Sequence, residues 1–146
     1  MKTIYIAVME RLKTKVTSLK WIDLDTGQLE APGDRPAVAF PCALLSIEIP
    51  RADDITDMDQ DCEARITVRF AFSQEMRTNS AAPVRVIDAA MNPYDVIASA
   101  YAALQGWGNA SFDPLSRTSQ GKENSRTGLF VYRMVFKTRF EDQTAE

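Results

Sequence analysis

The chain has 146 residues and a mass of 16.3 kDa, which is the size of one ordinary domain. Apolar residues make up 45% and charged residues 25%, which argues against a disordered chain, and the 6 glycines and 7 prolines exclude a collagen-like one. The net charge of −3 argues against a general nucleic-acid binder, because neutralising phosphates requires a cationic surface. The chain has no histidine, so His-dependent triads and His metal sites are excluded, and the composition favours a globular α+β domain over an enzyme.

The first third predicts one helix and two strand regions. Apolar residues recur at spacings of three and four over residues 3–19, which predicts an amphipathic helix. Residues 21–30 then predict a short hairpin that turns at Asp25-Thr26-Gly27, followed by a loop over 31–36. Residues 37–49 predict a buried strand that ends at Pro50, with Pro41 near its start or at a bulge.

The sharpest change in composition comes next. Arg51–Glu63 holds six acidic residues against one arginine, a net charge of −5, and predicts a solvated acidic loop. Cys62–Phe72 then has a strong period of two, with apolar residues alternating with Glu63, Arg65, Thr67, Arg69 and Ala71, which predicts a strand with one face in the core.

The second half predicts a helix between strands. A polar loop runs from residue 73 through Ser80, and residues 83–90 allow a helical turn. Asn92-Pro93 predicts the start of a helix that continues to Gln105. A strand over 111–119, a polar turn over 120–128 and an alternating strand over 129–140 complete the chain, with 140–146 as a frayed tail of a single domain spanning 1–146. The resulting fold class is α+β, with a mainly antiparallel sheet and both helices packed on one side.

No motif in the chain predicts a catalytic, cofactor or metal site. Asp57-x-Asp59-x-Asp61 resembles the opening of an EF-hand, but Cys62 stands where the loop needs Gly, and Val68 where it needs Glu. Serines lack a nucleophile-elbow motif, and no glycine-rich loop follows a strand. The apolar run in the first ten residues is too short for a secretory signal, so nothing in the sequence places the chain in an oxidising compartment. Cys42 and Cys62 are therefore interpreted as buried thiols. We therefore expect no catalytic residue, no metal and no cofactor.

Charge is distributed unevenly along the chain. Residues 111–140 contain six basic and two acidic residues, a net charge of +4, which contrasts with the acidic run. One interpretation is that these are two ordinary solvated faces. The other is that the acidic segment of one copy meets the basic segment of the next, as in head-to-tail ring interfaces. The candidate interface residues are Asp53, Asp57, Asp59, Asp61, Arg117, Lys122 and Arg126.

The order of these elements resembles a known family. Phe40-Pro41 before a strand, the acidic segment, the helix 92–105, and the stretch 112–120 before the final strand 131–140 are similar to the tail-terminator (tail-completion) proteins of long-tailed bacteriophages and prophages, especially Bacteroidetes-type members. The C-terminal strand with its ending Phe140-Glu141-Asp142 carries the resemblance most strongly, and the segment 21–30 is less typical of the family.

The resemblance implies a structural role without catalytic residues. It implies a homo-oligomer, a ring of six copies, that caps the tail tube and contacts the tube protein and a neck or head-completion protein. Such a protein is assembled in the bacterial host cytoplasm and resides at the tail–neck junction of the virion, with no membrane partner and no sequence-specific nucleic-acid partner. A head–tail connector or stopper, a component of a tail-like injection machine, and a small ligand-binding module stay open as alternatives.

Overall fold

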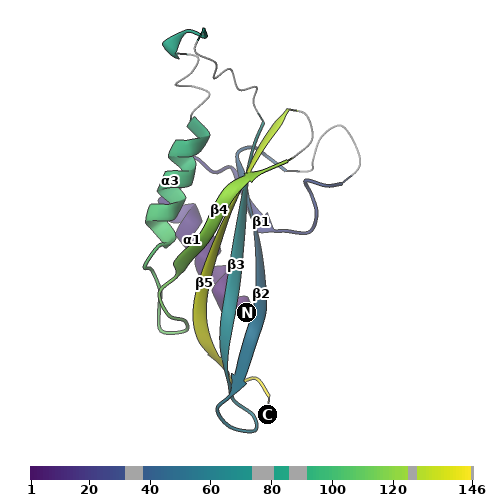
Figure 1. The fold of residues 1–146 in the computed structure, drawn as a ribbon, viewed down its shortest axis with the longest axis vertical. Helices are drawn as coiled ribbons and strands as arrows, with labels where there is room; N and C mark the ends of the chain where they lie inside the picture. The colour runs from purple at the N-terminus through teal and green to yellow at the C-terminus, as the bar shows by residue number, and fades with distance from the viewer. Residues whose placement is uncertain (32–37, 74–80, 86–91, 125–127, 146) are drawn as a thin grey trace.

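A five-stranded sheet in the order β1-β2-β3-β5-β4 organises the molecule, and two helices cover one of its faces (Figure 1). The computed structural model describes residues 1–31, 38–73, 81–85, 92–124 and 128–145. The pairing of β1 with β2 is parallel, whereas the other three pairings are antiparallel. The α+β class and the one-sided placement of the helices are therefore confirmed. The elements are α1 (Lys2–Lys15), β1 (Trp21–Leu24), β2 (Cys42–Asp54), β3 (Gln60–Ser73), α3 (Asn92–Leu104), β4 (Ser116–Glu123) and β5 (Leu129–Asp142).

The N-terminal helix forms as predicted but ends earlier. Ile4, Val8 and Leu12 of α1 are buried against the sheet, and Val16 follows them into the core. The helix stops at Lys15, where the Val16 N–H donates to the Leu12 carbonyl at 2.8 Å. The residues beyond include β-branched side chains and a serine, which are poor helix formers, so the predicted extension to residue 19 is wrong.

The predicted hairpin over residues 21–30 is also wrong. The turn forms at Gly27, whose φ is 85°, but β1 pairs in parallel with β2 instead of with the residues after the turn. The Asp25 N–H continues that pairing by donating to the Leu45 carbonyl at 2.7 Å. Leu29 is buried on the sheet face opposite the helices. Tertiary packing therefore places the residues after the turn over this face and not beside β1.

Strand β2 continues beyond the proline that was predicted to end it. A bulge between Glu48 and Arg51 accommodates Pro50, and pairing with β3 resumes as far as Asp54. A bulge leaves a residue out of the ladder, so the missing N–H of proline removes no hydrogen bond there. Pro41 lies just before the strand, after a cis peptide bond with Phe40.

The period of two in β3 places the core as predicted. Ile66, Val68 and Phe70 are completely buried and belong to the cluster that packs against α1 and α3. Thr67 and Arg69 lie on the other face, which we call the open face of the sheet. The alternation of β5 is confirmed in the same way, since Phe130, Met134 and Phe136 enter the core.

The C-terminal strands differ from the prediction mainly in their bounds. Helix α3 starts at Asn92 as predicted and ends one residue early, and Gly106 follows with a φ of 71°. Residues 107–115 form a loop in which Phe112 and Leu115 are buried, so the strand predicted from residue 111 begins only at Ser116. The first four residues of the predicted polar turn, 120–123, are strand, because they pair with β5. Strand β5 continues to Asp142. The predictions for 73–91 fall largely outside the described residues.

The core assignment predicts that substitutions at two positions on β3 differ strongly in their effect on the free energy of unfolding. Phe70→Ala removes a fully buried ring and should lower the free energy of unfolding by about 3–5 kcal/mol. Thr67→Ala, on the open face, should cost less than about 1 kcal/mol. Urea denaturation of both variants measures this, and equal losses would contradict the assignment of the two faces.

Candidate assembly surface

The acidic run forms the projecting end of the β2–β3 hairpin and is not the predicted loop. Asp53 of β2 lies directly opposite Asp61 of β3, and only residues 55–59 make the turn. The Thr56 hydroxyl accepts from the backbone N–H groups of Met58 (3.2 Å) and Asp59 (3.0 Å), and the Ile55 N–H donates to the Asp59 carbonyl at 2.8 Å. The turn is therefore held by its own hydrogen bonds. The hairpin extends past both helices to the bottom of Figure 1.

Two apolar side chains are exposed on this turn. Ile55 is 52% and Met58 54% exposed, and Asp57 lies between them in sequence. We call residues 55–59 the hairpin tip. Single exposed apolar residues are common on protein surfaces, but two together at the end of a projection form a small apolar contact surface. Sequence reasoning emphasised the carboxylates and overlooked these two residues.

Three of the four acidic interface candidates have contacts within their own chain. Asp53 accepts from Arg51 Nε at 3.0 Å, Asp59 accepts from the Thr56 hydroxyl at 3.1 Å, and Asp61 pairs with Arg139. Asp61 also raises the pKa of Arg139 by accepting its hydrogen bond. Asp57 has no side-chain partner among the residues described. Its charge is therefore the one most available to another molecule.

The basic candidates lie elsewhere in the molecule. The Arg117 guanidinium stacks 4.0 Å from the centre of the Tyr101 ring and donates to Gln120 at 2.7 Å. The Lys122 ammonium lies 5.7 Å from the centre of the Phe130 ring. Both belong to edge strand β4, and Arg126 lies outside the described residues. Their contact with the acidic segment was predicted between two copies, and it stays a prediction.

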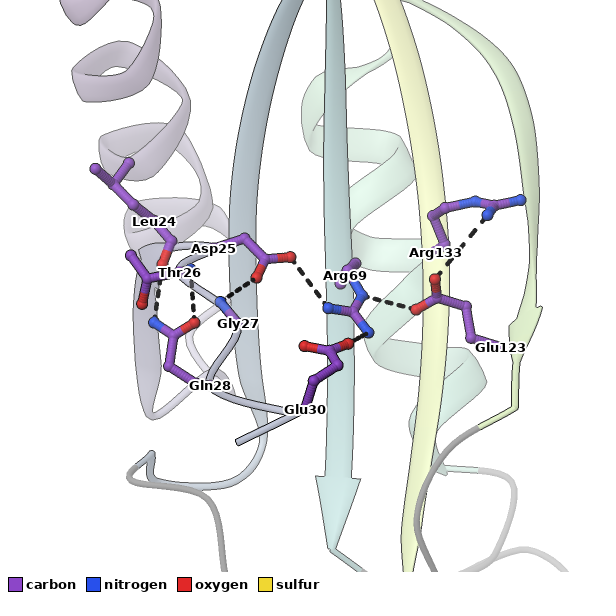
Figure 2. A network of polar contacts seen from close by, with 9 residues as sticks. All are labelled: Leu24, Asp25, Thr26, Gly27, Gln28, Glu30, Arg69, Glu123 and Arg133. Atoms are coloured by element: carbon purple, nitrogen blue, oxygen red, sulfur yellow. Dashed lines mark hydrogen bonds and ion pairs between the residues drawn. The ribbon is translucent and has the colours of Figure 1, made fainter. Parts of the chain in front are cut away.

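An arginine cluster that sequence reasoning missed occupies the open face (Figure 2). Arg69 contacts three carboxylates: Nη1 lies 3.1 Å from Asp25, Nη2 2.5 Å from Glu30, and Nε 2.7 Å from Glu123. Glu123 also lies 4.0 Å from Arg133, which is directly opposite Arg69 on β5. Like charges opposite each other on paired strands repel, so Glu123 offsets this repulsion.

The centre of this arginine cluster is largely buried. The side chain of Arg69 is only 16% exposed and that of Asp25 15%. Burial opposes the charge of Arg69, but its hydrogen bonds to Glu30, Glu123 and Asp25 outweigh this effect and raise its pKa above the usual value. The cluster fastens the segment after β1 to the middle of the sheet, and we interpret it as structural. A charged residue on the wet face of an alternating strand carries no sequence signal of such partners.

The remaining features show little that resembles a reaction centre. A polar groove of about 680 Å³ lies where the start of α1, the loop 109–113 and the end of β5 meet. In the described parts of the chain, no group of three or more acidic, thiol or imidazole side chains is placed to hold a metal ion. Cys42 and Cys62 are free and buried, as predicted. Neither described helix combines the length and apolar character needed to cross a membrane.

Comparison of the chain with protein-family models and with curated proteins found no match. The fold and the hairpin tip therefore have to support the functional interpretation by their own chemistry.

Removing the centre of the arginine cluster should destabilise the fold. Arg69→Leu leaves three carboxylates close together without their cation, and we expect a loss of about 2–4 kcal/mol in the free energy of unfolding. Arg65→Leu is the matched control, because it breaks one exposed pair with Glu48 and should cost less than about 1 kcal/mol. Chemical denaturation measures both variants, and similar losses would show that the cluster has no structural role.

The buried thiol of Cys42 should react slowly in the native protein. Burial raises its pKa from 9.0 to about 11. Because the thiolate is the reactive form, a raised pKa lowers the reactive fraction at pH 8. Mass spectrometry after iodoacetamide treatment should find Cys42 unmodified in the folded protein and modified in urea. Rapid native alkylation would contradict this.

Proposed function

We propose that the chain is a structural assembly protein, a tail terminator whose copies form a ring that caps a phage-like tail tube and joins it to the head or neck. The observation that carries the proposal is the projecting β2–β3 hairpin, whose ordered turn exposes Ile55 and Met58. Asp57 lies between them in sequence, and its side chain has no partner in the described parts of the chain. A rigid projection with apolar side chains at its end is suited to contact another protein subunit. The order of elements that resembles the terminator family supports the same function.

Charge and apolar surface have different tasks in such an interface. Exposed ion pairs contribute only about 0–1 kcal/mol each, so they set orientation and salt sensitivity. Apolar contact supplies most of the affinity. The acidic candidates at the tip are suited to steer the approach to a cationic surface, for which Arg117, Lys122 and Arg126 are the sequence-predicted partners. This function requires no cofactor and no catalytic step.

The alternatives differ in what they require of the molecule. A connector, a stopper or an injection-machine component also forms a ring, and the bound neighbours distinguish these from a terminator. A ligand-binding module needs a cavity between sheet and helices, whereas packed core side chains hold the centre of that space. A groove of about 280 Å³ lies at one end, where the start of α3 meets Phe40, Pro41 and Phe72. The tip therefore favours an assembly function.

The oligomeric state of the purified chain tests the proposal. Sedimentation velocity and negative-stain imaging should show closed rings, with six copies expected from the resemblance, and the rings should bind the end of tail tubes. A chain that stays monomeric at every concentration and ignores tail tubes would contradict the proposal.

Reversing the free charge at the tip should weaken assembly. Asp57→Lys should raise the concentration needed for half-assembly at low salt, and the difference from the wild type should shrink at high salt because ions screen exposed charges. Glu48→Lys is the control, since it makes the same charge change on the open face away from the tip. Equal effects of the two substitutions would show that only net charge matters.

A further inference from the structure

A groove between α1 and β1 has the chemistry to receive the hairpin tip. It has a volume of about 330 Å³, and the adjoining strand β1 exposes Trp21 by 41% and Leu24 by 40%. Its charged lining residues are Lys13, Lys20 and Glu10, which together carry a net charge of +1. Its apolar lining consists of Met9, Leu19, Trp21 and Ile22.

The tip and the groove are complementary. The tip presents two apolar side chains with acidic residues around them, and the groove has four apolar lining residues and a net positive charge. Tryptophan is among the residues that contribute most to protein interfaces when they are covered. Contact between the two surfaces would bury Trp21 against Ile55 and Met58 and place Asp57 near the lysines.

Edge strand β4 is less suited to this role. It carries the predicted basic partners Arg117 and Lys122, but its sequence SRTSQGKE contains no large apolar side chain. Arg117 is already engaged with Tyr101 and Gln120. A surface with charge and no apolar area can steer an approaching subunit but contributes little affinity.

The tip cannot occupy the groove of its own chain. Strand β1 pairs with the first four residues of β2, Cys42–Leu45, whereas the tip follows the end of β2 at Asp54. Nine to twelve strand residues at about 3.3 Å each separate the two surfaces by about 30–40 Å. The groove and the tip therefore lie toward opposite ends of the sheet, and the occupant has to come from another molecule.

We propose that the hairpin tip of one copy docks into the α1–β1 groove of the next copy of this chain. The contact is heterologous, so each copy uses its tip toward one neighbour and its groove toward the other, and a suitable rotation closes the chain of copies into a ring. This inference rests on the proposed self-assembly and names the two surfaces that carry it.

Paired variants test the two surfaces separately. Ile55→Ser with Met58→Ser changes the tip, and Lys13→Glu with Lys20→Glu changes the groove. Each pair should weaken assembly about 30-fold or more. The tip pair removes two apolar anchors, and the groove pair places glutamates where they repel the carboxylates of the tip. Arg117→Glu with Lys122→Glu makes the same charge change on β4 and should alter assembly less than about 3-fold. Circular dichroism checks that all variants are folded.

Mixing the variants gives the sharper readout. A tip variant retains its groove and a groove variant retains its tip, so an equal mixture should form one-to-one dimers and no rings in native mass spectrometry. Neither variant should assemble alone. Rings in the mixture, or a mixture that stays monomeric, would overturn the assignment of tip to groove.

Cross-linking provides a test that does not depend on weakened assembly. Met58→Cys and Lys13→Cys chains, mixed under mild oxidation, should form a disulfide-linked pair, whereas Met58→Cys with Lys122→Cys should not. The native cysteines are buried and should not compete. Preferential linking to position 122 would overturn the inference and favour β4 as the receiving surface. Wild-type rings that no groove substitution affects would overturn the inference alone, and a wild type that never assembles would overturn the proposed function as well.

Discussion

The structure depends on the pairing of β3 with a strand on each side. β3 pairs with β2 and β5 along nearly its whole length, so its alternation decides which face of three strands becomes the core. Ile66, Val68 and Phe70 give one face an apolar surface that α1 and α3 cover. On the other face, Thr67 and Arg69 are polar, and a smaller apolar cluster that includes Leu29 and Leu44 is buried. A shift by one residue would exchange these faces, so the buried residues also determine the register that aligns the charged ones.

The open face shows how that register controls electrostatics. Arg69 lies beside Arg133, an unfavourable arrangement in isolation. Carboxylates from two other parts of the chain resolve it: Glu123 contacts both arginines, and Asp25 arrives from the segment after β1. The parallel strand β1 and the turn at Gly27 therefore belong to one arrangement, in which a short edge strand delivers acidic side chains to the middle of the sheet. The same residues explain why segment 21–30 does not fold back as a hairpin.

Sequence reasoning predicted what local periodicity determines. The burial of α1, the two faces of β3 and β5 and the fold class follow from spacings of two or of three to four residues. The start of α3 follows from the Asn92-Pro93 helix-start signal. It failed where distant contacts override local preference. Pro50 predicts a strand end, but a bulge accommodates it and the strand continues. Residues 120–123 predict a turn, but they pair with β5. For the candidate site, sequence reasoning located the acidic segment but not its turn, because the exposure of Ile55 and Met58 depends on where the hairpin ends.

The length of the hairpin links the fold to the proposed assembly. β2 continues nine residues past its last pair with β1, and β5 continues past β4, so the lower part of the sheet is a ribbon of three strands. Such a ribbon, with an apolar tip and hydrogen bonds within its turn, gains nothing for the stability of its own core from exposing Ile55 and Met58. Exposure of these two side chains to water is unfavourable in an isolated monomer. Covering them with another subunit would contribute favourable free energy to association. Because the α1–β1 groove lies near the other end of the sheet, the proposed docking joins two unlike surfaces. Subunits joined in this way continue from copy to copy until the geometry closes them.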